Sequence, residues 1–117
     1  AVPPANELPI PPSADLMEPG PSAPGLSVPE LESMVRSVAE RRKWTVTKSA
    51  DGLMVLHLSH RGYDATLYVR CDPSGVQIFS DSYYDGLLGD RAKKHPDGWI
   101  KNIREDLEAR IRRMSRR

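Results

Sequence analysis

The chain has 117 residues, a formal net charge of +1 and a single cysteine. This length allows one small domain, and one cysteine excludes an intramolecular disulfide or a cysteine-rich metal cluster. No apolar stretch approaches the roughly 20 residues that a membrane-spanning helix needs.

The first 28 residues differ in composition from the rest of the chain. Nine of the eleven prolines lie between Pro3 and Pro29, among Ser, Ala and Gly. Such a segment buries too little apolar surface to offset the entropy of ordering it. The sequence therefore predicts a disordered, proline-rich tail over residues 1–28 and one domain over residues 29–115.

A helix is predicted at the start of the domain. Ser27 and Glu30 have the spacing of a capping box, and Pro29 lies in the first turn, where a missing N–H is harmless. Apolar residues then recur at helical spacing, and basic residues at 41–43 suit the negative end of the helix dipole.

Four β-rich runs follow at 44–48, 53–59, 65–71 and 76–81, with turn residues at Gly52, Gly62 and 73–75. The alternation of side chains predicts one apolar face for these strands. The opposite face is predicted to show a mixed set of side chains: Val55, His57, Thr66, Tyr68, Arg70, Gln77 and Phe79. Cys71 is expected to be a small buried apolar residue.

The last helix is predicted to begin near Pro96 or Asp97 and to run towards Met114, with one apolar stripe that belongs to the core. The fold class that follows is α+β. We expect a two-layer sandwich in which the N- and C-terminal helices cover one face of an antiparallel sheet of three or four strands.

The succession of elements resembles a family of small bacterial envelope proteins, many described as lipoproteins, whose function is uncharacterised. The matching features span roughly residues 31–111 and comprise Trp44, the Gly52 turn, the run 54–58, Arg61 with Tyr63, the strand 65–69, Asp81-Ser82, and Trp99-Ile100 with Asn102 and Ile103. The resemblance implies an αβ sandwich in the periplasm or outer envelope, exported with its signal peptide removed, and no catalytic residues.

This chain departs from the family pattern in three ways. Lys93, Lys94, Pro96 and Asp97 stand where the family has Ile-His and Tyr-Asn pairs, and Cys71 replaces an aromatic residue. No N-terminal cysteine is present in the sequence as given, so lipidation does not follow from it.

Residue chemistry gives little support for catalysis or metal binding. His57 and His60 are three positions apart, which does not place them on one strand face, and no ligand set accompanies them. Ser82 with His95 and one of Asp81, Asp85 or Asp90 could form a triad, but no nucleophile elbow is present. We expect a non-enzymatic protein without a cofactor, in which Ser82 and Asp81 hydrogen-bond the backbone at a strand end.

Binding is predicted instead, in a long loop at 82–95 and on the open sheet face. The loop offers Tyr83, Tyr84, Leu87 and Leu88, and the face offers Tyr68, Arg70 and Phe79; long loops with apolar tips often bind partners. Equally, Leu87 and Leu88 could fold back over the sheet edge. The sequence favours a monomer or weak dimer that binds another protein or an envelope component.

Two other functions match parts of the sequence. The order helix, three strands, helix is that of the double-stranded-RNA-binding domain, and Arg91, Lys93 and Lys94 lie where that domain contacts phosphates. Bulky Trp99 and several acidic residues weaken this alternative. Membrane attachment through the arginine-rich C-terminus would need the apolar stripe that the core already uses.

Overall fold

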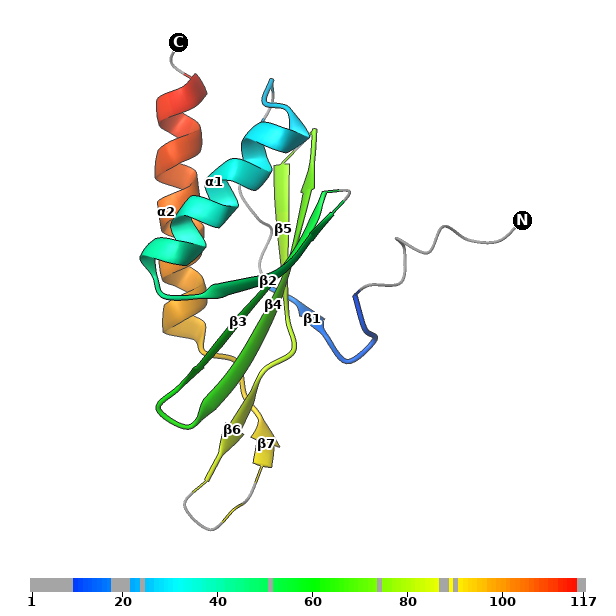
Figure 1. Ribbon diagram of the computed structural model, residues 1–117, viewed down its shortest axis with the longest axis vertical. Helices are drawn as coiled ribbons and strands as arrows, with labels where there is room; N and C mark the ends of the chain where they lie inside the picture. Colours follow the sequence, from blue (N-terminus) through cyan, green and yellow to red (C-terminus); the bar gives the residue numbers. More distant parts are fainter. Residues whose placement is uncertain are drawn as a thin grey trace, which may run out of the picture.

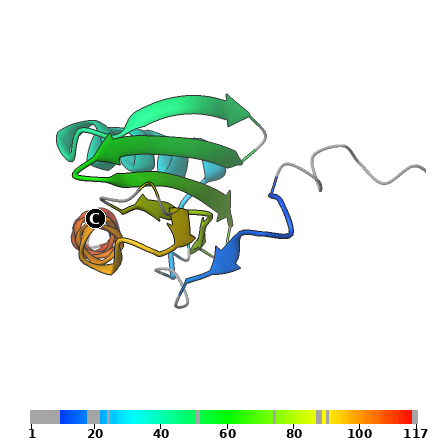
Figure 2. The same ribbon diagram turned by 90° about the horizontal axis from the view of Figure 1, so that it is seen from below.

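The computed structural model describes residues 10–17, 22–23, 25–50, 52–73, 75–86, 89 and 91–115. One antiparallel sheet of seven strands carries two helices on one face, as Figures 1 and 2 show. The α+β class agrees with the prediction, but the predicted sheet of three or four strands is wrong. Four long strands are present, and three short ones extend the sheet.

Helix α1 (Val28–Arg41) begins at the predicted capping box. The Ser27 Oγ accepts a hydrogen bond from the Glu30 N–H at 3.3 Å, and the Glu30 carboxylate accepts one from the Ser27 N–H at 2.9 Å. The helix ends in a Schellman motif, because the Lys43 N–H donates to Glu40 and the Trp44 N–H to Ala39. Its apolar face is buried: Leu31, Met34, Val35, Val38 and Ala39.

Helix α2 (Asp97–Ser115) confirms the predicted start and stripe. Ile100, Ile103, Leu107 and Ile111 are buried, and Trp99 and Met114 are partly buried against the same core. Neither helix, over the residues described, combines the length and apolarity needed to cross a membrane.

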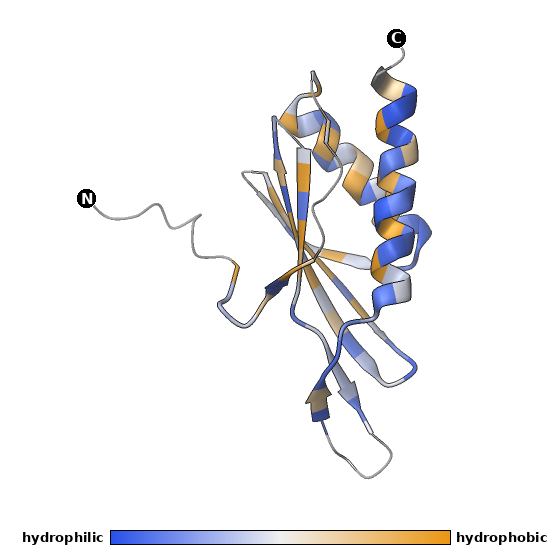
Figure 3. Ribbon diagram, turned by 180° about the vertical axis from the view of Figure 1, so that it is seen from behind, coloured by the Kyte–Doolittle hydropathy of each residue, from blue (hydrophilic) through white to orange (hydrophobic). Residues whose placement is uncertain are grey.

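The four long strands are consecutive antiparallel neighbours: β2 (Thr45–Ala50), β3 (Leu53–His60), β4 (Tyr63–Asp72) and β5 (Gly75–Ser80). Buried residues alternate with more exposed ones along β4, and Figure 3 shows apolar and polar segments interspersed along the strands. The side chains facing the helices form one buried core with them, including Met54, Leu56, Leu67, Val69 and Ile78. β2 lies at an outer edge and contains a bulge between Val46 and Lys48.

The turn between β2 and β3 requires a glycine. Gly52 has φ +82°, and a Cβ on it would lie 2.7 Å from the Cys71 carbonyl oxygen. The Gly52 N–H donates to the Glu32 carboxylate of α1 at 2.9 Å, and its carbonyl accepts from the Cys71 N–H. The turn is therefore tied to both the first helix and β4.

Three short strands were not predicted. β1 (Asp15–Leu16) pairs with β5, β6 (Tyr83–Asp85) pairs with β4, and β7 (Arg91–Lys93) pairs with β6. The segment 82–95, predicted to be a loop, thus contains a β-hairpin. It forms because β6 continues the direction of β5 after Asp81, whose N–H donates to Thr66 of β4.

Part of the predicted tail also packs on the domain. Asp15 and Leu16 pair with Ser80 and Phe79, and Ala23 is fully buried in the core. At these residues the structure departs from the expectation of a separate tail. Backbone pairing with β5 holds Asp15 and Leu16, and Lys93 of the distant β7 contacts Asp15.

Candidate functional site

The sheet register separates the predicted site residues onto two faces. Tyr68, Arg70 and Phe79 lie on the open face, as predicted from the alternation of β4 and β5. Tyr83 pairs with Asp64 and shares that face, whereas Tyr84 pairs with Tyr63 and lies on the side of the helices. Leu87 and Leu88 lie outside the described residues.

An apolar row crosses the open face. Val55, Tyr68, Phe79 and Leu16 stand opposite one another on β3, β4, β5 and β1, and we call them the open-face row. Leu16 is 55 % exposed, and the other three are partly exposed. Burial, with a smaller effect of the Asp81 charge, raises the pKa of the Tyr68 hydroxyl.

Charged groups occupy the end of the open face beside the row. Asp64 accepts from Arg91 at 2.9 Å and contacts the His57 Nε2 at 2.6 Å. Arg91 also reaches Asp85 at 3.3 Å and lies over the Tyr83 ring at 4.7 Å. The hydrogen bond from Arg91, and then that from His57, lowers the pKa of Asp64. These charges are largely balanced within the molecule.

The basic residues on which the nucleic-acid alternative depends also contact partners within the molecule. Arg91 pairs with two carboxylates, and Lys93 contacts Asp15 at 3.2 Å and the Ser13 carbonyl. Lys94 lies over the rings of Tyr63 and Tyr84. Phosphate contacts would have to displace these internal partners, so the arrangement does not favour nucleic acid.

On the other side of the sheet, aromatic side chains form a continuous cluster: Trp44, His60, Tyr63, Tyr84 and Trp99. Trp99 contacts Trp44 edge to face with ring centroids 6.2 Å apart, and Tyr63 with centroids 5.2 Å apart. Tyr63 in turn contacts Tyr84 at 5.0 Å. Edge-to-face contacts of this kind are favourable beyond the area that they bury.

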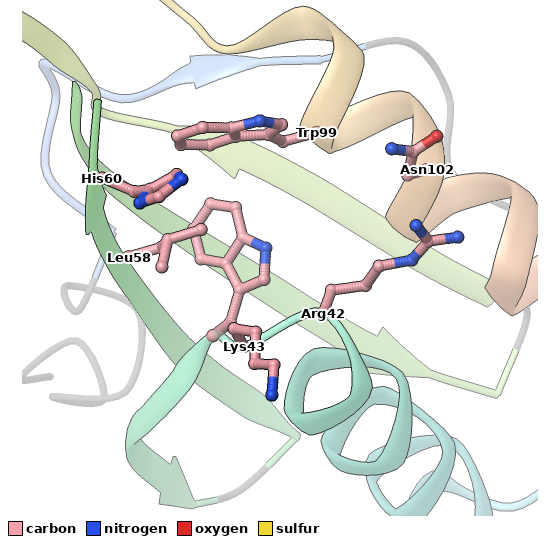
Figure 4. Close-up of a pocket in the computed structure, with 7 residues that line it drawn as sticks. Arg42, Lys43, Leu58, His60, Trp99 and Asn102 are labelled. Carbon is pink, nitrogen blue, oxygen red and sulfur yellow. The ribbon is translucent and has the colours of Figure 1, made fainter. Parts of the chain in front are cut away.

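A cavity of about 350 Å³ opens at one end of this cluster. Trp44 and Trp99 line it, and Figure 4 shows Trp99 on one side and Arg42 and Lys43, which follow α1, on the other. Sequence analysis missed this tryptophan pocket, because it assigned Trp99 to the core stripe and Trp44 to a strand.

His95 does not form the triad that was considered with Ser82. Its Nδ1 lies 2.7 Å from the Ser80 Oγ, which lies 2.8 Å from the Ser82 Oγ, and its Nε2 lies 2.9 Å from Asp15. Ser80 and Ser82 are both fully buried, so a substrate has no access to either hydroxyl. In this geometry the chain of contacts holds β1 and the entry to α2 against β5.

His57 and His60 lie apart in the structure. His57 contacts Asp64 on the open face, and His60 lies beside Trp99 with ring centroids 6.0 Å apart. Over the described part of the chain, no group of three His, Cys, Asp or Glu side chains could hold a metal ion.

Comparisons with known proteins add no family. The chain matches no protein-family model, no curated protein and no solved structure. The resemblance to envelope proteins therefore stays a prediction, and the functional argument rests on the geometry of the open face and the tryptophan pocket.

Proposed function

We propose that this protein is a non-enzymatic binding protein that recognises another protein through the open face of its sheet. The observation that carries the proposal is the open-face row, in which four apolar side chains from four strands form one continuous strip. Aromatic side chains surrounded by polar groups are typical of the centre of protein interfaces. Neighbouring apolar groups on a surface indicate an interaction site more strongly than scattered ones do.

The charges beside the row indicate the chemistry of the partner. Arg70 lies next to Tyr68 on the same face of β4, and Lys48 stands opposite Val55 at the end of the row. Neither forms an ion pair with a residue that the structure describes. A protein surface with apolar groups flanked by carboxylates complements this arrangement.

Site-specific photo-crosslinking in the cells that make the protein tests the proposal. A benzophenone amino acid at position 79, or at position 55, should give the same crosslinked protein. At Glu105, on the exposed side of α2, it should give none. Arg70→Glu should reduce the product formed from position 79, because it reverses the charge that the partner's carboxylate would meet.

Three results would contradict the proposal. One is the absence of any product from positions 55 and 79. Another is equal yield from position 105. A product of twice the chain mass would identify the occupant as a second copy instead of a different protein. The periplasmic location implied by the resemblance remains part of the proposal, and cell fractionation tests it separately.

A further inference from the structure

The tryptophan pocket lies on the opposite side of the sheet from the open-face row and is lined by three segments of the chain. Lys43 and Trp44 come from the segment between α1 and β2, Leu58 from the end of β3, and Trp99 and Asn102 from the first turns of α2. A volume of about 350 Å³ lies in the range of small-molecule sites. The pocket is therefore large enough for a small ligand.

Its walls are aromatic and apolar. The rings of Trp44 and Trp99 meet at 87°, so that the two indoles form a corner, and Leu58 adds an aliphatic surface. Trp44 is buried, whereas Trp99 is only partly buried. Trp99 is therefore the indole on which a planar ring can stack, and Trp44, 3 % exposed, lines the base of the corner.

The rim is cationic and lacks a carboxylate among its described lining residues. Arg42 donates from Nε and one Nη to Asp106 at 2.8 and 3.2 Å, so its charge is largely balanced. Lys43 forms no ion pair with any described residue and is exposed. It is thus the unpaired cation of the rim, and Figure 4 shows its side chain extending away from Trp99 and Asn102, so it would turn toward the pocket to reach a ligand.

The backbone conformation of Lys43 is uncommon for a residue with a side chain. This residue occupies the position of a Schellman motif that glycine usually takes, with φ +70°. Arg61, outside the pocket lining, also has a positive φ of +53°, so this conformation alone does not mark a binding residue. What distinguishes Lys43 is its exposed position at the rim of an aromatic cavity.

We propose that the tryptophan pocket binds a small carboxylate that carries a planar apolar ring. The ring lies against Trp99 at the opening of the corner with the buried Trp44, and the carboxylate pairs with Lys43 once that exposed side chain turns toward the pocket. A cationic ligand would be repelled by Lys43, and a neutral one would gain nothing from it. A polyphosphate would leave the apolar walls uncovered and would find one unpaired cation.

Titration by NMR tests the proposal in the full chain, because both of its tryptophans line the pocket and each gives one indole N–H signal. Naphthoate is the probe, and naphthalenemethanol is a neutral control of the same shape. We expect naphthoate to shift both indole signals saturably and to bind at least about threefold to fivefold more tightly than the alcohol, as one accessible ion pair predicts.

Two matched variants test whether Lys43 is the cation that binds the carboxylate of the probe. Lys43→Asn removes the cation and fits the positive φ, and it should weaken naphthoate binding to the level of the alcohol. Arg61→Asn removes a charge at another exposed position with φ +53°, outside the pocket lining, and should leave naphthoate binding unchanged. The amide spectrum of each variant checks its fold.

Three outcomes would overturn the proposal: no saturable shift of the indole signals, equal affinity for acid and alcohol in the wild-type protein, or equal affinity for naphthoate before and after Lys43→Asn. The proposed protein interface is on the other face of the sheet, so the crosslinking and the titration succeed or fail independently.

Discussion

On the helix-covered side of the sheet, Trp99 contacts Trp44 edge to face and Tyr63 at a tilt, whereas on the open side Tyr68 and Phe79 lie in a single row. The first set packs between two helices and the end of the sheet. The second set rests on the sheet alone. Side chains enclosed on several sides contribute mainly to folding, and side chains supported from one side are available to a partner.

Two adjacent tyrosines of β6 lie on opposite faces of the sheet. Tyr83 lies on the open face beneath Arg91, and Tyr84 contacts Tyr63 within the aromatic cluster. Successive residues of a strand point to opposite faces, so forming β6 gives the two rings different surroundings. A pair that looks uniform in the sequence thus contributes one residue to each region.

Thiol alkylation should show the largest difference between the two faces. Cys71 is buried on the covered face, and burial raises its pKa from 9.0 to about 12. At about pH 8 it then holds about a thousandfold less thiolate than an ordinary cysteine. In a Phe79→Cys variant, we expect iodoacetamide to label position 79 about a thousandfold faster than Cys71, measured by peptide mass spectrometry over time. Similar rates at the two positions would show that the open face is covered in the free protein.

Truncation of an aromatic ring should separate the regions by stability. Trp99→Ala removes contacts with Trp44, His60 and Tyr63, and we expect the free energy of unfolding to fall by about 3 kcal/mol. Phe79→Ala loses two cross-strand pairs, with Tyr68 and with Leu16, and should lower it by about 1 kcal/mol. Urea unfolding followed by circular dichroism measures both. An equal loss from both variants would assign the open-face row to folding.

Acid should lower the free energy of unfolding through both regions, by less than the Trp99→Ala substitution does. Hydrogen bonds from Arg91 and His57 lower the pKa of Asp64 on the open face, and those from Arg42 lower the pKa of Asp106 beside the tryptophan pocket. A lowered pKa in the folded state gives stability that is present above the ordinary value of 3.8 and is lost as the pH falls through the folded pKa.

We expect the two carboxylates together to account for about 1 kcal/mol or less of unfolding free energy, because about a third of each side chain is exposed and solvent screens the ion pairs. The loss occurs below about pH 4, and urea midpoints between about pH 6 and pH 2 measure it. Asp64→Asn and Asp106→Asn should each flatten the profile. A profile that neither variant changes would show that other groups control acid stability.

The regular elements could be predicted because their signals are local. The capping box at Ser27 and Glu30 starts α1, and alternation between Met54 and Cys71 assigns both faces of β3 and β4. The stripe on α2 was predicted from its helical spacing. Each of these signals comes from residues that are close together in the sequence, and the periodicity of a helix or strand places their side chains on one face.

The short strands could not be predicted because distant residues hold them. β1 has two residues in a proline-rich segment, and Asp15 is fixed by His95 and Lys93, about 80 positions along the chain. β6 and β7 carry too few apolar residues to show an alternation. The Pro-rich composition predicts a weak local preference for structure, and tertiary contacts hold the chain at these positions.

The site was predicted in part for the same reason. The alternation of β4 and β5 placed Tyr68, Arg70 and Phe79 on the open face, where the structure has them. The tryptophan pocket required the end of α1, the end of β3 and the start of α2 to meet. Its signal in the sequence is that both tryptophans of the chain have basic or amide neighbours: Arg42 and Lys43 for one, Asn102 for the other.

The bulge in β2 has a consequence for how the molecule associates. An outer strand offers unpaired backbone groups that could recruit a strand from another chain, and a bulge with a lysine beside it disrupts that row. Between Val46 and Lys48 the spacing of donors and acceptors is broken. Growth of the sheet into ordered aggregates from this border is thereby disfavoured, and contacts with other proteins are directed to side chains.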